Sequence, residues 1–171
     1  MGTVKISNST LSGNGATGAG GGISNAGGTV TINNSTLSGN TTRNSSGGGG
    51  ISNVGTATLQ NTIVANSPRG GNCYGAMTSD GYNLSSDGTC TFSNTGDLNN
   101  AHPKLGTLGN YGGPTQTIPL LSGSPAIDAG NPSGCTDNQG HLLKTDQRGQ
   151  PRPDKEDTVG CDMGAYESQK D

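Results

Sequence analysis

The feature that most constrains this chain is an internal repeat near its N-terminus. The segment Thr3–Asn14 recurs with few changes as Thr29–Asn40, and a weaker third copy opens at Thr56. A second element, Gly-Gly-Gly-Ile-Ser-Asn, ends at Asn25 and again at Asn53. Successive copies begin 26 and 27 residues apart, and the two Gly-rich elements lie 28 residues apart. Repeats of this length are typical of solenoids, in which each repeat packs on its neighbours.

The spacing of apolar residues selects strands over helices. No window of the repeat carries the i, i+3, i+4 apolar spacing of a helix, and Gly and Asn are poor helix formers. Val30 and Ile32 instead alternate with polar residues, which is the period of a strand. We therefore predict an all-β parallel β-helix, a solenoid of about 26–28 residues per coil. Its inward columns are Val4/Val30/Ala57, Ile6/Ile32/Leu59, Leu11/Leu37/Val64 and Ile23/Ile51.

Asn residues follow these strands at matching places, where the chain must turn. Asn tolerates a left-handed backbone, and its amide can hydrogen-bond the same amide one coil away. Such ladders would support narrow coils in a chain with 26% hydrophobic residues, one Phe and no Trp. The predicted ladders are Asn8/Asn34/Asn61, Asn14/Asn40 and Asn25/Asn53.

The four cysteines fall in two neighbouring pairs, Cys73 with Cys90 and Cys135 with Cys161. An even number in loop-rich, non-repeating sequence favours two structural disulfides. A single Cys₄ metal site is the competing interpretation, although no CxxC spacing is present. Disulfides predict an extracellular or cell-surface location, because they persist in oxidising compartments.

Composition changes after about residue 92, where seven of the eight Pro residues and most of the charge follow. We therefore divide the chain into β-helix coils at 1–92 and a C-terminal cap at 93–171 that packs on the last coil. No apolar run approaches the ~18 residues needed to span a bilayer. The net charge of −3 is too weak to steer the protein to nucleic acid or an anionic membrane. Neither a nucleic-acid partner nor membrane insertion is expected.

Several ordered motifs in the second half carry a family resemblance. They are Gly81-Tyr82-Asn83-Leu84, Asn110-Tyr111-Gly112-Gly113-Pro114-Thr115, Ser124-Pro125-Ala126-Ile127-Asp128-Ala129-Gly130, Asp146-Gln147-Arg148-Gly149 with Arg152-Pro153, and Cys161-Asp162-Met163-Gly164-Ala165-Tyr166-Glu167. Together they resemble the choice-of-anchor Q domain, over roughly residues 56 to 167.

The coils carry a second resemblance. Their Gly-Gly-Gly-Ile and Leu-Ser-Gly-Asn elements are similar to the GGxI and FxxN repeats of polymorphic outer membrane proteins, with Leu11 and Leu37 where Phe is usual. The two resemblances imply a large bacterial secreted or surface protein, built as a right-handed β-helix that the C-terminal region closes. Neither family brings a defined activity, so function must be argued from sites.

Catalysis on the coil faces is not expected. β-Helix enzymes that cleave acidic polysaccharides need clustered carboxylates on a strand face, and residues 1–70 contain no Asp, Glu or His. We predict no catalytic residue and no metal or other cofactor. Acidic residues gather in the C-terminal region, where turn-forming and solvated roles compete with a structural Ca²⁺ site. They are Asp128, Asp137, Asp146, Asp154, Glu156, Asp157, Asp162 and Glu167.

The first function class is a non-catalytic, extracellular structural or adhesin-like module. The chain begins inside a repeat, so its open first coil could receive another copy and build fibres end to end. A surface polysaccharide or a cell-surface ligand is the partner expected of an adhesin. A polysaccharide-binding or polysaccharide-cleaving β-helix protein is the second class.

Ice or crystal-surface binding is the third class. Outward Thr-x-Thr columns could order water or a repetitive surface, and they comprise Thr3, Thr29 and Thr56 beside Thr31 and Thr58. Lys5 interrupts the second column. The simpler account is that Thr is a good strand residue on a solvated face.

Overall fold

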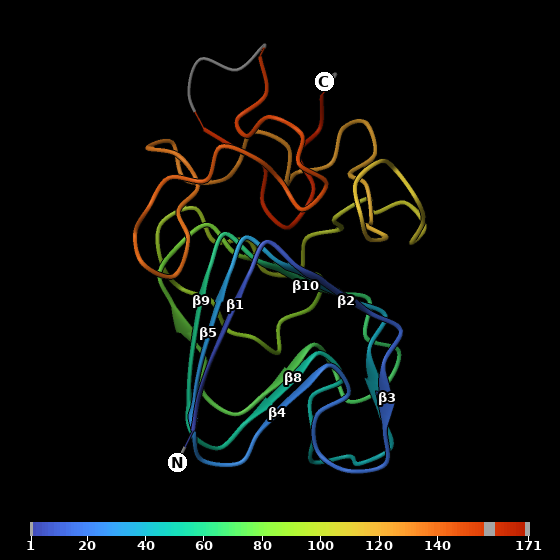
Figure 1. The fold of residues 1–171 in the computed structure, drawn as a ribbon. Coiled ribbons are helices and arrows are strands. Elements are labelled where there is room, and N and C mark those ends of the chain that lie inside the picture. The colour runs from blue at the N-terminus through green and yellow to red at the C-terminus, as the bar shows by residue number, and fades with distance from the viewer. Residues whose placement is uncertain (1, 156–159, 170–171) are drawn as a thin grey trace.

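The computed structural model describes residues 2–155 and 160–169, and this part of the chain contains strands and no helix. Parallel strands of successive coils stack side by side, with three sheets of three or four strands and one of two (Figure 1). In Figure 1 the chain runs clockwise round each coil, and β1, β5 and β9 lie progressively farther from the viewer. The predicted parallel β-helix is therefore confirmed, and it is right-handed.

Each sheet contains one strand from each coil that reaches it. The first sheet comprises β1 (Thr3–Ser7), β5 (Thr29–Asn33), β9 (Thr56–Gln60) and β12 (Thr78–Ser79). The second comprises β2 (Thr10–Ser12), β6 (Thr36–Ser38), β10 (Ile63–Ala65) and β13 (Leu84–Ser85). The third comprises β4 (Ile23–Asn25), β8 (Ile51–Asn53) and β11 (Cys73–Tyr74), and the fourth β3 (Gly15–Ala16) and β7 (Thr41–Thr42).

The inward columns stack in the predicted register. Val4 pairs with Val30 and Val30 with Ala57, and the other three columns pair in the same way. Cys73 continues the column of Ile23 and Ile51 into the last coil. A one-residue slip would turn every apolar side chain outward, so burial of one face fixes the register.

The two ends of the β-helix differ in how well the core is covered. Ile6, Leu11 and Ile23 in the first coil are only partly buried, whereas Ile32 and Leu37 in the second are completely buried. At the far end, a segment that we call the end segment, residues 86–101, folds across the last coil. Its Cys90 and Phe92 pack on the core, and the Cys73–Cys90 disulfide fixes it there. The far end is closed and the near end is open.

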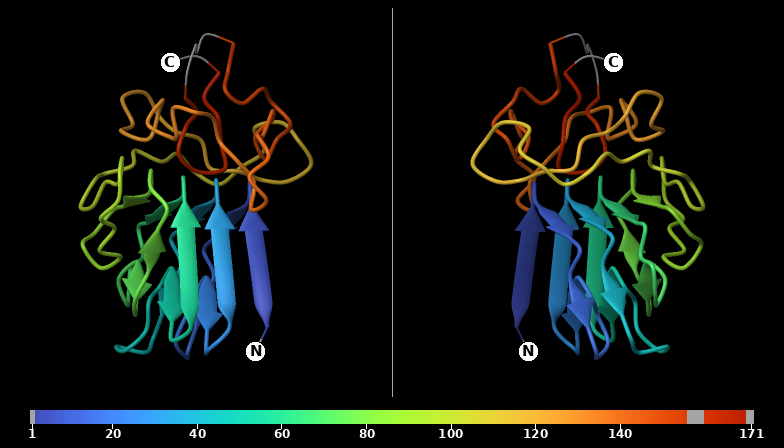
Figure 2. Two further views of the ribbon diagram at one scale, coloured as in Figure 1. Left: turned by 90° about the vertical axis from the view of Figure 1, so that its left-hand side faces the viewer. Right: turned by 90° about the vertical axis from the view of Figure 1, so that its right-hand side faces the viewer.

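From the sequence we expected the C-terminal region to pack on the last coil. In the structure it also contacts the other coils. The end segment packs on the last coil, for example through pairing of Leu84 with Leu98. Leu120, Ala126 and Met163 pack with Ile63, Ala65 and Leu84 of the third and last coils. The chain then turns back across all the coils, on the side where the first sheet ends (Figure 2). There Asn8 Nδ2 of the first coil donates to Thr145 O at 3.1 Å. The turns after the first sheet present polar groups that need partners, and this region supplies them.

We call residues 131–155 and 160–169 the lateral layer. Its hydrogen bonds reach the first, second and third coils, through Asn8, Asn34 and Asn61 respectively. Residues 105–120, before the layer, form a hairpin in which Leu105 pairs with Leu120 and Gly109 with Thr117. The second half of the protein therefore covers one flank of the β-helix along its length.

Burial along the second inward column predicts graded stability losses. We expect Ile32→Ala to lower the free energy of unfolding by about 2–5 kcal/mol, because it empties a fully buried position. Ile6→Ala in the same column should cost clearly less, since Ile6 is partly exposed. Urea denaturation followed by circular dichroism measures both. Equal losses would contradict an open first coil.

Candidate functional site

The first Asn ladder lies at the turn between the first and second sheets. Asn8, Asn34 and Asn61 have φ values of 53°, 47° and 53°, so all three adopt the left-handed conformation expected of them. Asn61 Nδ2 donates to Asn34 Oδ1 at 3.0 Å, which forms one rung between coils. Asn34 Nδ2 and Asn8 Nδ2 donate to the lateral layer instead. This ladder therefore joins two coils and docks the layer.

The other two ladders form amide-to-amide bonds without a left-handed Asn. Asn14 Nδ2 donates to Asn40 Oδ1 at 3.0 Å, and Asn25 Nδ2 donates to Asn53 Oδ1 at 2.7 Å. Beside Asn14 and Asn40, the left-handed residues are the preceding glycines, Gly13 and Gly39, with φ of 67° each. The prediction that Asn adopts a left-handed backbone at the turns therefore holds for the first ladder only. At the second ladder the preceding Gly adopts this conformation, at lower cost than Asn would.

Asn61 is the point where the coils, the lateral layer and a disulfide meet. Its Nδ2 donates to Asp162 O at 3.1 Å and lies 2.6 Å from Cys135 Sγ. Its Oδ1 accepts the backbone N–H of Asn131 at 3.1 Å. Cys135 is bonded to Cys161, and both are buried. The two predicted disulfides are both present, which excludes the alternative Cys₄ metal site.

Two buried contacts between an arginine and a carboxyl group lie within the lateral layer. Arg152 Nε lies 2.7 Å from Glu167 Oε2, and both side chains are completely buried. Arg152 also donates to Asn8 Oδ1 at 3.3 Å, so this pair reaches the first coil. Arg148 lies 2.7 Å from Asp146 Oδ2 and its guanidinium stacks 3.5 Å from the Tyr166 ring centroid.

Sequence reasoning placed neither the Asp146–Arg148 contact nor the Arg152–Glu167 pair. Arg152 and Glu167 both lie in motifs that carry the family resemblance, which was the only signal available. Removing Glu167 would leave the buried Arg152 guanidinium without its nearest acceptor.

The acidic residues that the structure describes do not assemble into a metal site. Among residues 2–155 and 160–169, no group of three or more His, Cys, Asp and Glu side chains could hold a metal ion. Asp137 instead caps its own loop, and the N–H groups of His141 and Gln139 hold the pKa of its carboxyl below the usual value. Glu156 and Asp157 lie outside the described residues.

The outward face of the first sheet presents threonines in two columns. Thr3, Thr29 and Thr56 pair in one column, and Lys5, Thr31 and Thr58 pair in the other. The structure extends the second column, because Thr78 pairs with Thr58. At the C-terminal end of these strands the lateral layer covers the face, for example where Asn33 Nδ2 donates to Asp137 O at 3.3 Å. The exposed part is a narrow hydroxyl-rich surface.

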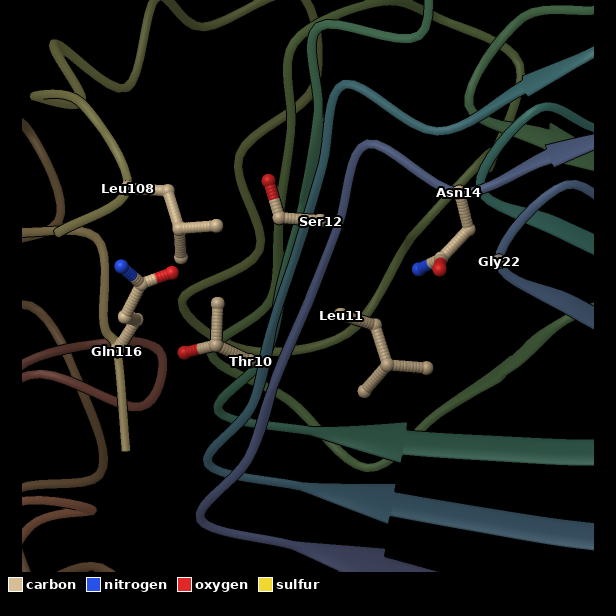
Figure 3. A pocket seen from close by; sticks show the side chains of 7 residues that line it. All are labelled: Thr10, Leu11, Ser12, Asn14, Gly22, Leu108 and Gln116. Carbon is tan, nitrogen blue, oxygen red and sulfur yellow. The ribbon is translucent and has the colours of Figure 1, made fainter. Parts of the chain in front are cut away.

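A cavity of about 480 Å³ lies at the open end of the β-helix (Figure 3). Leu11 and Asn14 approach it from inside the first coil, and Thr10 and Ser12 from the outer side of β2. Leu108 and Gln116 of the hairpin lie opposite Thr10 and Ser12. Its lining is hydroxyl, amide and aliphatic, with no acid or base that could transfer a proton.

Comparisons of the chain with protein-family models, with curated proteins and with solved structures gave no match. The resemblance to the choice-of-anchor Q domain therefore stays a prediction that rests on its motifs. No helix in the described part of the chain is long and apolar enough to cross a membrane. The two disulfides indicate an oxidising, extracellular environment.

Glu167 predicts a pH dependence of stability. Burial raises the pKa of its carboxyl from 4.5 to about 8, against the opposing effect of Arg152. Its buried Oε1 has no hydrogen-bond partner in the described part of the chain, which also disfavours the ionised form. The folded protein therefore holds this proton more tightly than the unfolded chain does. The resulting stabilisation is complete below pH 4.5 and is lost as the pH rises through about 8.

We expect the free energy of unfolding to fall between pH 5 and pH 9, and Glu167→Gln to flatten that fall, because Gln does not titrate. Urea titrations of both proteins across this range, given as the difference between them, isolate the contribution of Glu167. Parallel pH profiles for the two proteins would refute the assignment.

Proposed function

We propose that this protein is a non-catalytic structural or adhesin-like module of an extracellular bacterial β-helix protein, and that it forms a rigid end of that β-helix. The observation that carries the proposal is the lateral layer, whose hydrogen bonds reach all three repeated coils. The disulfides support an extracellular location for the module. The resemblance to the choice-of-anchor Q domain and to polymorphic outer membrane protein repeats agrees with a bacterial surface protein.

Mechanical rigidity follows from how the layer is attached. Coils of a solenoid contact only their neighbours, so an end coil frays unless something else holds it. Here Thr10 Oγ1 donates to Gln147 Oε1 at 2.6 Å and Asn138 Nδ2 donates to Ile6 O at 3.1 Å, which ties the first coil to residues more than a hundred positions away. The Cys135–Cys161 disulfide locks the layer that makes these contacts. Such a module resists pulling and proteolysis.

The chemistry of the exposed surfaces supports a non-catalytic role over polysaccharide cleavage. Residues 1–70, which form most of the coils, contain no Asp, Glu or His. The carboxyl groups of Asp146 and Glu167 in the lateral layer are buried against Arg148 and Arg152. Hydrolysis of a glycosidic bond typically uses two carboxyl groups that flank the bond, and residues 1–70 of the coils contain none.

Incubation with acidic and neutral polysaccharides tests the non-catalytic role. We expect no unsaturated products and no new reducing ends above the level of heat-denatured protein. Retarded migration in gels that contain one of the polysaccharides would support an adhesin-like role. Product release that tracks the folded protein would overturn the proposal in favour of an enzyme.

Ice or crystal-surface binding is the second candidate, and one observation favours it. The continuation of the outward column through Thr78 lengthens the array of matched hydroxyl groups along the first sheet. Lys5 at the end of the same column shortens the usable surface.

Charged substitutions on this face would abolish such binding without unfolding the protein. We expect Thr31→Lys combined with Thr58→Lys to remove any thermal hysteresis, because two ammonium groups would disrupt the flat array. Ser24→Lys, at an exposed position of β4, is the matched control and should leave hysteresis unchanged. Absence of hysteresis in the unmodified protein would eliminate this candidate.

A further inference from the structure

Every strand of the first coil has an unpaired edge. β1, β2 and β4 each lie at the end of their sheet, and β3 has a single neighbour. Their free N–H and C=O groups form a template on which another strand can pair. Within the same coil, Ile6, Leu11 and Ile23 are only partly covered. The open face therefore combines unpaired backbone with apolar side chains, as the face between two stacked coils does.

The hairpin extends past this open face. In both views of Figure 2 it is the yellow loop that projects beyond β1, on the outer side of the β-helix. Leu108, near its tip, is 44% exposed and lines the cavity opposite Thr10 and Ser12. In the figure, Leu11 lies on the inner side of β2 and Leu108 on the outer side (Figure 3). The cavity therefore lies along the unpaired edge of β2, with Leu11 on its inner side and Leu108 on its outer side.

We propose that the open face is the docking surface for one further β-helix coil, stacked parallel and in register on the first coil. The hairpin would contact the outer side of this coil. The strand entering the cavity would have the polar–apolar–polar pattern of Thr10-Leu11-Ser12. Its apolar residue would cover Leu11, and its hydroxyl groups would face Gln116. Each requirement is met by the repeat that this chain already contains.

The backbone at Gly2 shows how such a coil would connect to the first coil. Gly2 O accepts the N–H of Thr29 at 3.0 Å, as Gly28 O accepts the N–H of Thr56 at 3.0 Å. Gly2 therefore occupies the place of Gly28, through which one coil leads from its third sheet into the next. A coil carried by the same polypeptide and leading into Gly2 would lie directly on the open face, without a linker.

A second copy of this chain fits the face less well. The end segment covers the last coil with Cys90 and Phe92, so a second copy offers no free face for head-to-tail stacking. Two open faces could meet only about a two-fold axis, which would pair the copies in the opposite sense to all the strands of the coils. The end-to-end fibre expected from sequence therefore has no second free face to use.

An inserted coil tests the proposal directly. The extended protein carries a second copy of residues 3–28 between Gly2 and Thr3, and its control carries the same insert with the counterparts of Val4, Ile6, Leu11 and Ile23 changed to Ser. We expect the extended protein to be more stable to urea than the unmodified protein. Amide exchange in β1 and β2 should slow by about tenfold or more, because their edges become paired. The control should show neither effect.

A probe on the hairpin tests whether the hairpin contacts the added coil. The chain has no Trp, so Leu108→Trp introduces a single reporter. Its emission should shift to the blue in the extended protein but not in the control. If the extended protein aggregates, a synthetic peptide with the sequence of residues 3–28, added to the Leu108→Trp protein, should produce the same shift.

Two results would overturn the proposal. The first is a protease-sensitive insert, or an inert peptide, with unchanged emission of the reporter. The second is a dimer of the unmodified protein in sedimentation experiments that Ile6→Asp dissolves, because this would assign the face to a second copy.

Discussion

The whole structure depends on parallel stacking in register of very short strands. No strand in the described part of the chain is longer than five residues, so each coil contributes only one or two inward side chains per sheet. A column of three such residues is stable only if each member lies directly on the next, because the interior has no room for a mismatch. This constraint explains the near identity of the first two repeats. It also explains where they differ in length, since the added residues lie in the Gly- and Ser-rich loop before β8, where they disturb no column.

A core this narrow cannot fix the segments outside the coils by hydrophobic contact alone. Hydrogen bonds and buried charged groups also hold them in place. Asn61 illustrates the solution, because one side chain bonds the preceding coil, the lateral layer and its disulfide. The buried Arg152 does the same for the first coil, joining Asn8 to Glu167. Groups of this kind are costly to bury, yet they accept only one arrangement of partners, so the layer has one position on the coils.

The sequence predicted the repeated half well because its information is local and periodic. Val30 and Ile32 identify a strand face, and their counterparts one repeat away identify the column. The cysteine pairs were equally accessible, since each pair is close in the chain. No such local or periodic pattern predicts the path of the lateral layer. Asn8 and Thr145 are 137 positions apart, and no periodicity links them. The prediction of a cap on the last coil describes the end segment but not the contacts of the lateral layer with the first coils, because it assumed that neighbours in sequence stay neighbours in space.

The same columns explain why the two ends of the β-helix cannot be alike. In the third sheet, the column of Ile23 and Ile51 ends at Cys73, whose sulfur is bonded to Cys90 of the end segment. A further coil at this end would need an apolar side chain where the disulfide already lies, so stacking stops there for a covalent reason. At the near end no residue in the described part of the chain continues the column, and Ile23 remains partly exposed. The β-helix therefore has a direction, and it can be lengthened only from the side at which β1 lies.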